Sequence, residues 1–465
     1  MTIVSGLLQV DKGEQAVPLR VVDKAGFETW LKSQPPRSRA AVAASGFKGQ
    51  ADAIAILPGD NAEWSAVVGV KDAAALGPWC LAKAAESLPE GRYRIEGAAP
   101  GVAALGWLLA HYSFDKYKKP ASAKGPRVLL TPEPAKIAEA VLLAEATALV
   151  RDLVNIPAGD LGPGELEAAV RDVAANCGGA AVTVTAGAAL DEGYPMIAAV
   201  GRAATAERAP RLIELEWGDQ RHPRLAIVGK GVCFDSGGLD IKPSSGMRWM
   251  KKDMGGAAHA LALARLVMKS RLPVRLHLLI PAVENAISAA AFRPGDVLRS
   301  RKGLTVEIGN TDAEGRLILG DALQKAVEGA PELILDYATL TGAARVALGP
   351  DLPALFANDD LLAESLLLAG RETADPAWRM PLWQPYEEML SSDIADLGNA
   401  SDAPMAGAVT AALFLGKFVP ETISWAHFDT FAWRGAAKPG RPKGGEALGL
   451  RAGWSMLAAR YPRSA

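Results

Sequence analysis

The stretch NTDAEGRL, residues 310–317, follows a β-rich run at 305–308 and precedes a helical apolar pattern at 317–329. Its acids Asp312 and Glu314 lie two positions apart, and side chains with this spacing diverge on a helix. Both carboxylates can point into one site only from an extended or turned backbone. The stretch therefore predicts a functional loop between a strand and a helix.

Alternating β-rich and helical runs extend on both sides of this loop. A helical run covers residues 255–270, and further β-rich runs cover 211–217, 225–229, 274–280, 333–337 and 423–427. This alternation is typical of a mixed, mainly parallel sheet flanked by helices, with functional loops at the carboxyl ends of the strands. We expect an α/β fold of this class.

The length of 465 residues exceeds the size at which one hydrophobic core keeps growing, which favours two domains. Residues 1–130 mix short apolar runs with helical patterns and predict a smaller N-terminal α/β domain. Residues 131–156 predict a linking helix, which ends before Pro157 because proline disfavours helix in the preceding residue. Residues 157–465 are expected to form the larger domain, which carries the polar motifs.

The composition argues against several classes of protein. Lys and Arg number 50 against 52 Asp and Glu, a formal net charge of -2, which supplies no general attraction to nucleic acid or anionic membrane. The 3 cysteines lack CxxC spacing; they indicate no disulfide framework and fit a reducing cytoplasm. The N-terminus has no signal-peptide pattern, and no apolar run reaches the roughly 18 residues that span a bilayer. We expect a cytoplasmic protein without membrane or nucleic-acid partners.

Several common catalytic motifs are missing. None of the 5 histidines forms HExxH, and the chain has neither a GxSxG elbow nor a Walker phosphate loop. What the sequence offers is a set of acids close to glycines, namely Asp235, Asp253, Asp312 and Glu314. Taken singly, Asp253 could be a helix N-cap, and Asp312 or Glu314 could lie in a solvated turn. Taken together, buried carboxylates require cations, so the cluster predicts divalent metal.

Longer motifs resemble the leucyl aminopeptidase, or cytosol aminopeptidase, family. They are VGKGVCFDSGGLDIKPSSGMRWMKKDMGGAA (228–258), PAVENAIS and RPGD within 281–296, NTDAEGRL (310–317) and ATLTGAA (338–344). The resemblance is much looser in the first 130 residues. It implies a metal-dependent aminopeptidase, which releases N-terminal amino acids from peptides.

The resemblance assigns five metal ligands by position, and each keeps the residue type that the family uses: Lys230, Asp235, Asp253, Asp312 and Glu314. Asp235 and Glu314 would serve both of two divalent ions, for which manganese and zinc are the expected metals. Lys230 must lose its proton to coordinate a metal, which costs about 4.6 kcal/mol at pH 7 for an ordinary lysine. Burial and the metal must offset that cost.

The resemblance also implies the catalytic roles. A metal-bridging hydroxide attacks the peptide carbonyl, while Lys242 helps to stabilise the negative oxygen that develops. Arg316 holds a bicarbonate ion as general base, with backbone amides near Leu340 and Gly342 as further donors. The free α-amine of the substrate occupies a coordination position, which explains exopeptidase action. Members of the family assemble as hexamers, so a homohexamer is implied.

The side-chain pocket departs from the family pattern. Three of its positions keep the family residues: Met250, Asn310 and Thr339. A later segment reads HFDTFAWRG, residues 427–435, where many members carry a small-residue step followed by apolar residues. We hypothesise that Phe431 and Trp433 reshape the pocket and change the preferred N-terminal residue. The alternative is that both rings belong to the core.

Two other functions are compatible with parts of the pattern. Paired divalent ions also serve phosphoryl transfer, so a two-metal phosphoesterase is one alternative; the Lys230 ligand and the NTDAEGRL context disfavour it. A non-catalytic DNA-binding or assembly role is the other, and the balanced charge argues against it.

Overall fold

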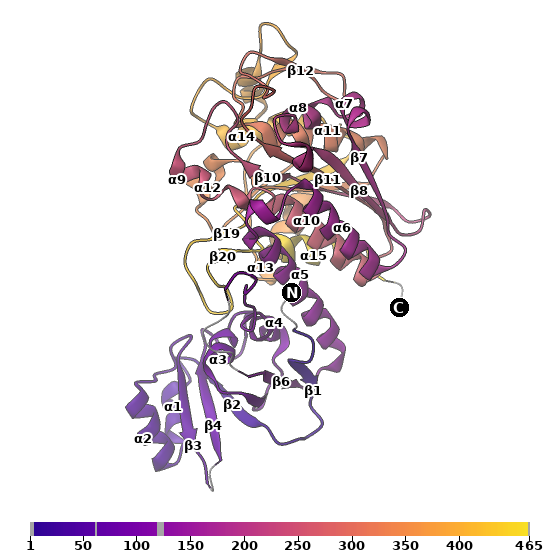
Figure 1. The fold of residues 1–465 in the computed structure, drawn as a ribbon. Helices are drawn as coiled ribbons and strands as arrows, with labels where there is room; N and C mark the ends of the chain where they lie inside the picture. The colour runs from indigo at the N-terminus through magenta and orange to yellow at the C-terminus, as the bar shows by residue number, and fades with distance from the viewer. Residues whose placement is uncertain (1–3, 61–62, 119–124, 464–465) are drawn as a thin grey trace. The chain divides into compact units, whose positions relative to one another are not determined.

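The computed structural model describes residues 4–60, 63–118 and 125–463. The chain divides into two compact units, unit 1 (Met1–Ala148 and Ala436–Lys443) and unit 2 (Leu149–Gly435 and Gly444–Ala465). The division falls within helix α5 (Pro134–Asn155), and the elements of each unit are labelled in Figure 1. The domain boundaries expected at 130 and 156 stay a prediction.

Unit 1 is built on a six-stranded sheet in the order β1-β6-β5-β2-β4-β3. Its strands are β1 (Leu8–Val10), β2 (Val17–Val22), β3 (Ile54–Pro58), β4 (Trp64–Gly69), β5 (Gly91–Ile95) and β6 (Arg127–Thr131). Neighbouring strands are parallel except at the edge, where β3 and β4 pair antiparallel.

Helices cover both faces of the unit 1 sheet. Successive residues of a strand point to opposite faces, and the strands contribute apolar side chains to a core on each face. Val22 packs with Phe27 and Val42, from α1 (Phe27–Lys32) and α2 (Pro36–Ser45), on one face. Leu19 and Trp107 belong to the core on the other face. That second core also includes residues of α3 (Ala82–Ser87), the 3₁₀ turn Gly101–Ala103, α4 (Ala104–Leu109) and α5.

Unit 2 is built on a nine-stranded sheet, in which the path β16-β15-β18-β14-β9-β11-β8-β7 is joined by β10 beside β11. The strands are β7 (Ala181–Ala186), β8 (Arg211–Trp217), β9 (Arg224–Gly229), β10 (Gly231–Asp235), β11 (Arg275–Asn285), β14 (Leu333–Ala338), β15 (Ala354–Ala357), β16 (Trp378–Arg379) and β18 (Ser424–Asp429). The centre, β18-β14-β9-β11, is parallel, and antiparallel pairs lie toward both edges. The expected mixed, mainly parallel α/β sheet is confirmed.

Two layers of helices enclose this sheet. One apolar core joins the sheet to α7 (Ala188–Gly193), α8 (Pro195–Gly201), α11 (Glu314–Glu328) and α14 (Gly407–Gly416). Helices in mutual contact across the other face are α6 (Pro163–Cys177), α10 (Gly255–Lys269), α13 (Asp360–Glu372) and α15 (Leu450–Arg460). Figure 1 shows α8 and α11 on one side of the strands and α10 and α15 on the other.

Smaller elements complete unit 2. They are two short helices, α9 (Ser244–Met247) and α12 (Gly342–Leu348), the small sheet β12 (Val297–Arg299), β13 (Thr305–Glu307) and β17 (Leu397–Gly398), the pair β19 (Trp433–Arg434) and β20 (Gly444–Gly445), and 3₁₀ turns at Ala158–Asp160, Ala206–Arg208, Met250–Lys252 and Gln384–Leu390. Among the described residues, no helix combines the length and the apolar character needed to cross a membrane.

The structure differs from the sequence prediction at the start of α11 and at the strand β10. Helix α11 begins at Glu314, so only Asp312 lies in the predicted loop, and Glu314 already belongs to the first helical turn. An acid is favourable there because the helix N-terminus carries partial positive charge. The strand β10 was not predicted, because it follows β9 after the single residue Lys230.

Candidate metal centre

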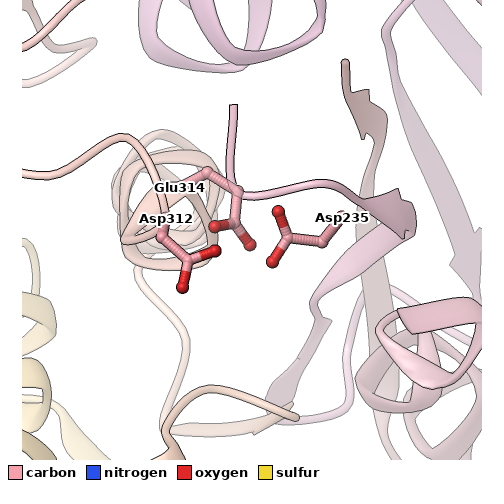
Figure 2. Close-up of side chains that lie close together, drawn as sticks. All are labelled: Asp235, Asp312 and Glu314. Carbon is pink, nitrogen blue, oxygen red and sulfur yellow. The ribbon is translucent and has the colours of Figure 1, made fainter. Parts of the chain in front are cut away.

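Three carboxylates from two parts of unit 2 converge beside the central strands. Asp235 ends β10, Asp312 lies in the turn before α11, and Glu314 begins α11. Each offers an oxygen, and these atoms all lie within 4.8 Å of one another; Figure 2 shows the three side chains directed toward a common space. Asp235 and Glu314 are buried, so the concentrated negative charge needs compensation.

Lys230 lies at the break between β9 and β10, where its backbone leaves the strand ladder. Its amide donates to Tyr337 O at 3.0 Å, and its carbonyl accepts from Ala257 N at 2.8 Å. The side chain is 3% exposed, with Nζ 2.8 Å from Asp253 Oδ2 and 3.0 Å from Glu314 Oε1. The Lys230 side chain thus lies between two of the expected metal ligands.

The protonation of Lys230 follows from these neighbours. Burial lowers the pKa of its ammonium, but the carboxylates of Asp253 and Glu314 raise it, and the net pKa lies above the usual value. An ammonium has no lone pair for a metal. Metal binding at Lys230 thus requires the cation to displace a proton.

Lys242 brings a second ammonium to the carboxylates. Its Nζ lies 2.8 Å from Asp235 Oδ2 and also contacts Asp312 Oδ1. Burial lowers and the carboxylates, Asp235 foremost, raise the pKa of Lys242, with a net increase. This side chain is 13% exposed, so a permanently charged group faces the cavity from beside the cluster.

The carboxylates of the cluster are suited to a cation. Burial, and next the neighbouring Asp235 carboxylate, raises the pKa of Glu314 to about 8 and that of Asp312 to about 6. Glu314 Oε2 is buried without a hydrogen-bond partner among the described residues, and Oε1, although close to Lys230, accepts no hydrogen bond of suitable geometry. Divalent cations would supply both the charge and the contacts that these oxygens lack. The residues present fit a metal site.

Asp253 is held by two further side chains. Thr339 Oγ1 donates to Asp253 Oδ1 at 2.8 Å, and Lys252 Nζ donates to the same oxygen at 2.7 Å. Burial raises the pKa of Asp253, but the combined effect of Lys230 and Lys252 lowers it by more, so the net shift of the pKa is downward. Lys252 was not predicted as a site residue. Its only signal in the sequence is its position next to Asp253.

Asn285 is a second residue that the sequence analysis did not identify. Its Nδ2 donates to Asp235 Oδ1 at 2.9 Å and to Thr311 O at 3.0 Å. The amide thereby joins the end of β10 to the turn that carries Asp312. The resemblance includes Asn285 in the motif PAVENAIS, but nothing in the local sequence indicates this contact.

The loop before α11 is held by two asparagines. Asn310 Oδ1 accepts the Asp312 amide at 2.7 Å, and Asn399 Nδ2 donates to Asn310 O at 2.7 Å. Asn310 therefore orients the Asp312 backbone as well as lining the cavity. Asn399 comes from a distant loop and was not predicted.

Arg316 points one unused donor into a buried environment. Its Nη1 donates to Asn399 O at 2.7 Å, whereas its Nε is buried without a hydrogen-bond partner among the described residues. Burial lowers the pKa of Arg316 to about 10. A buried, charged donor of this kind fits an anion. The expected co-donor amide of Leu340 instead donates to Asp429 Oδ1 at 3.0 Å, and Gly342 is the first residue of α12.

A cavity of about 410 Å³ opens beside the cluster. Its lining includes the ligand candidates Lys230, Asp235, Asp253 and Asp312, the catalytic candidates Lys242 and Arg316, the anion-site candidates Leu340 and Gly342, and the pocket candidates Met250, Asn310, Thr339 and Phe431. Trp433 is absent from this lining; it is buried, with its ring centroid 5.3 Å from that of Trp249. The two aromatic residues thus differ in environment: Phe431 lines the cavity, whereas Trp433 packs against Trp249.

The chain matches the model of the cytosol aminopeptidase family catalytic domain over residues 148–452 and that of the M17 aminopeptidase N-terminal domain over residues 17–130. A probable cytosol aminopeptidase of Roseiflexus castenholzii is 42% identical over 363 residues, which are 74% of this chain and 73% of the relative. One of a Geobacter species is 43% identical over 363 residues, 75% of this chain and 73% of the relative.

Two solved structures are similar to this chain over nearly its whole length. The crystal structure of a cytosol aminopeptidase from Coxiella burnetii superimposes with a TM-score of 0.93 and 46% identity, covering 98% of this chain and 100% of the other. The bottromycin maturation enzyme BotP in complex with Mn gives a TM-score of 0.86 and 33% identity, covering 96% of this chain and 100% of the other.

Proposed function

This chain belongs to the cytosol aminopeptidase family and is a metallo-aminopeptidase, and we propose that it cleaves N-terminal residues from peptides with two divalent ions. The ions would be held by Lys230, Asp235, Asp253, Asp312 and Glu314, with Asp235 and Glu314 in contact with both. The observation that carries this proposal is the buried, unsatisfied carboxylate of Glu314 among the other four side chains.

The chemistry of the metals would be Lewis acidity, which polarises a carbonyl and lowers the pKa of water. Manganese or zinc suits a set of carboxylates and one amine. BotP is known in complex with Mn, which supports manganese. In this chain the neutral Lys230 amine and the ionised Glu314 are the forms that bind a cation. The neighbouring carboxylates favour the charged form of Lys230, and burial favours the protonated form of Glu314, so both groups would lose a proton on binding metal.

Lys242 would act on the substrate carbonyl oxygen. Its ammonium reaches Asp235 and Asp312 at the edge of the cavity, so it lies close to the metal ligands and remains charged. A fixed positive charge near the developing negative oxygen stabilises the transition state more than the ground state. We therefore assign Lys242 to the oxyanion.

Arg316 would hold a bicarbonate ion, which accepts a proton as general base. The support is its buried Nε without a partner and the planar fork that suits a bidentate oxyanion. Gly342 would add a backbone donor. The same role for Leu340 requires its amide to exchange Asp429 for the anion.

The cavity lined by Met250, Asn310, Thr339 and Phe431 would receive the N-terminal side chain of the peptide. Assembly as a homohexamer and location in the cytoplasm complete the proposal; the names of the relatives support the second. The N-terminal domain would comprise residues 1–130 and the linking helix residues 131–156. The catalytic domain would comprise residues 157–465.

The test is hydrolysis of a panel of aminoacyl p-nitroanilides after chelation and readdition of single metals. We expect no hydrolysis without metal and recovery with manganese or zinc. Lys242→Ala should lower kcat by about a hundredfold or more while binding metal normally, since it removes one oxyanion contact. If no metal restores hydrolysis of any anilide, or if phenyl phosphate is the substrate cleaved, the proposal is wrong.

A further inference from the structure

One cation in the cavity lining lacks a partner. Arg345 of α12 lines the same cavity as the metal ligands, and within the described residues its guanidinium makes no ion pair and no hydrogen bond. The other cations of the lining all have partners: Lys230, Lys242 and Lys252 contact carboxylates, and Arg316 donates to Asn399 O. Arg316 and Arg345 are thus the two cations of the lining without an ion pair among the described residues, and Arg345 is the one that also donates no hydrogen bond.

The Arg345 guanidinium is held in place by stacking. Its Cζ lies 4.6 Å from the centroid of the Phe431 ring, within the range of a cation–π contact. Its Nη2 lies 3.7 Å from the position that a Cβ would take on Gly342. Stacking engages the flat face of the guanidinium and leaves its N–H groups available at the edge. A long and exposed side chain is thus ordered at the cavity with its donors unused.

The carboxylates of the lining do not compete for this charge. Asp253 is occupied by Lys230 and Lys252. Asp235 and Asp312 both contact Lys242. Asp429 accepts the Leu340 amide at 3.0 Å and the Thr341 hydroxyl at 2.6 Å.

A second cation, Lys252, lies near Phe431, but its charge is paired with Asp253. Lys252 Nζ lies 6.0 Å from the centroid of the same ring. Among the described residues, Arg345 is therefore the cation at this ring that has no counterion.

We propose that Arg345, ordered against Phe431, binds a carboxylate of the substrate. The carboxylate belongs either to the side chain of an N-terminal glutamate or aspartate or to the C-terminus of a short peptide. Two parallel hydrogen bonds from the guanidinium match a carboxylate and no neutral group. The inference rests on the proposed aminopeptidase function and makes Arg345 a residue that determines specificity.

The experiment compares isosteric substrates that differ by one charge. Glutamyl and glutaminyl p-nitroanilide test the N-terminal side chain, and Leu-Ala and Leu-Ala amide test the C-terminal carboxylate. The metal-loaded full chain is assayed as wild type, Arg345→Met, Arg345→Lys and Arg371→Met. Arg371 is an exposed arginine in the last turn of α13 and lies outside the cavity lining, so it is the matched control for loss of one positive charge.

We expect wild type to prefer the charged member of one pair by about tenfold or more in kcat/KM. Arg345→Met should remove a preference of about ten- to a hundredfold, the range of a charge-assisted hydrogen bond. Hydrolysis of the neutral member should fall by much less than hydrolysis of the charged member. Arg345→Lys should keep part of the preference, and Arg371→Met should keep all of it.

The failures are distinguishable. Normal hydrolysis of neutral substrates, with no charge preference in either pair or with a preference that survives Arg345→Met, overturns the inference and leaves the aminopeptidase function intact. The inference is also overturned if Arg371→Met lowers the preference equally, because a general charge effect then explains it. If the metal-loaded wild type hydrolyses none of the substrates, the proposed function itself falls.

Discussion

Replacing Gly315 by alanine should damage the metal site while leaving the fold intact. A Cβ at this position would lie 2.5 Å from Lys230 Cε, 2.6 Å from Nζ and 2.8 Å from Cδ. Lys230 is 3% exposed and cannot swing into solvent. The added methyl group therefore forces its Nζ away from Asp253 and Glu314.

The effect on stability should be small because two terms oppose each other. Alanine is favoured over glycine within a helix by about 1 kcal/mol, whereas overpacking a tight core costs about 1 to 3 kcal/mol. Gly315→Ala should thus change the free energy of unfolding by no more than about 2 kcal/mol. Displacement of a metal ligand should weaken binding of one metal by about ten- to a hundredfold or more and lower kcat/KM by about a hundredfold.

The assay combines calorimetric titration of Mn²⁺ into chelator-treated protein, hydrolysis of leucine p-nitroanilide and urea unfolding. Gly164→Ala is the matched control. Gly164 is also the second residue of a helix of 15 residues, and its Cβ would meet nothing closer than Arg211 Nη1 at 3.9 Å. It should bind metal and turn over substrate like wild type. Unchanged metal affinity and kcat/KM in Gly315→Ala would refute the assignment of Lys230 as a ligand.

Three further predictions follow from buried polar groups. Burial and the Arg127 guanidinium lower the pKa of His111 to about 4, so the stability that depends on the neutral imidazole is present above pH 6.5 and is lost as the pH falls toward 4. In urea unfolding of the full chain, wild type should lose about 2 kcal/mol more stability between pH 7 and pH 5 than His111→Gln. Asn285→Ala should weaken metal binding about tenfold, since Asp235 loses its amide donor; equal affinity in a metal titration would contradict this positioning role. Metal binding at pH 7 should release about two protons per subunit, because Lys230 and Glu314 must both deprotonate; the pKa of Lys230 is raised above its usual value, and that of Glu314 is raised to about 8. Calorimetry in buffers of different ionisation enthalpy measures the number of protons, and release near zero argues against both ligands.

The sequence predicted the sheet well where strands are long and apolar. The runs at 211–217, 225–229 and 333–337 correspond to β8, β9 and β14 within one residue at each end. The buried parallel strands β9 and β14 have a continuous apolar pattern, whereas β8 pairs antiparallel with both of its neighbours. The prediction failed at β10, where pairing with β11 decides the structure and the register shifts between Val232 and Phe234. No local periodicity encodes such a shift.

The sequence also could not resolve the two aromatic residues of the altered segment. Phe431 and Trp433 are two positions apart in the chain, and from the sequence either ring could face a pocket or the core. The structure places Phe431 beside the cavity under Arg345 and packs Trp433 against Trp249. Between the two rings, the backbone turns at Ala432, whose φ is 54°.

The sequence by itself determined the α/β class and the residue types of the site, because apolar periodicity, glycines and acids are local properties of the chain. Only the tertiary structure brought Lys230, Asp235 and Asp253 to Asp312 and Glu314, through the order of β9, β11 and β14 in one sheet. It alone placed the Lys230 side chain between Asp253 and Glu314, with room left at Gly315. It also placed Arg345, which forms no ion pair with a described residue, over Phe431. These properties depend on distances between side chains far apart in sequence, and such distances arise from packing.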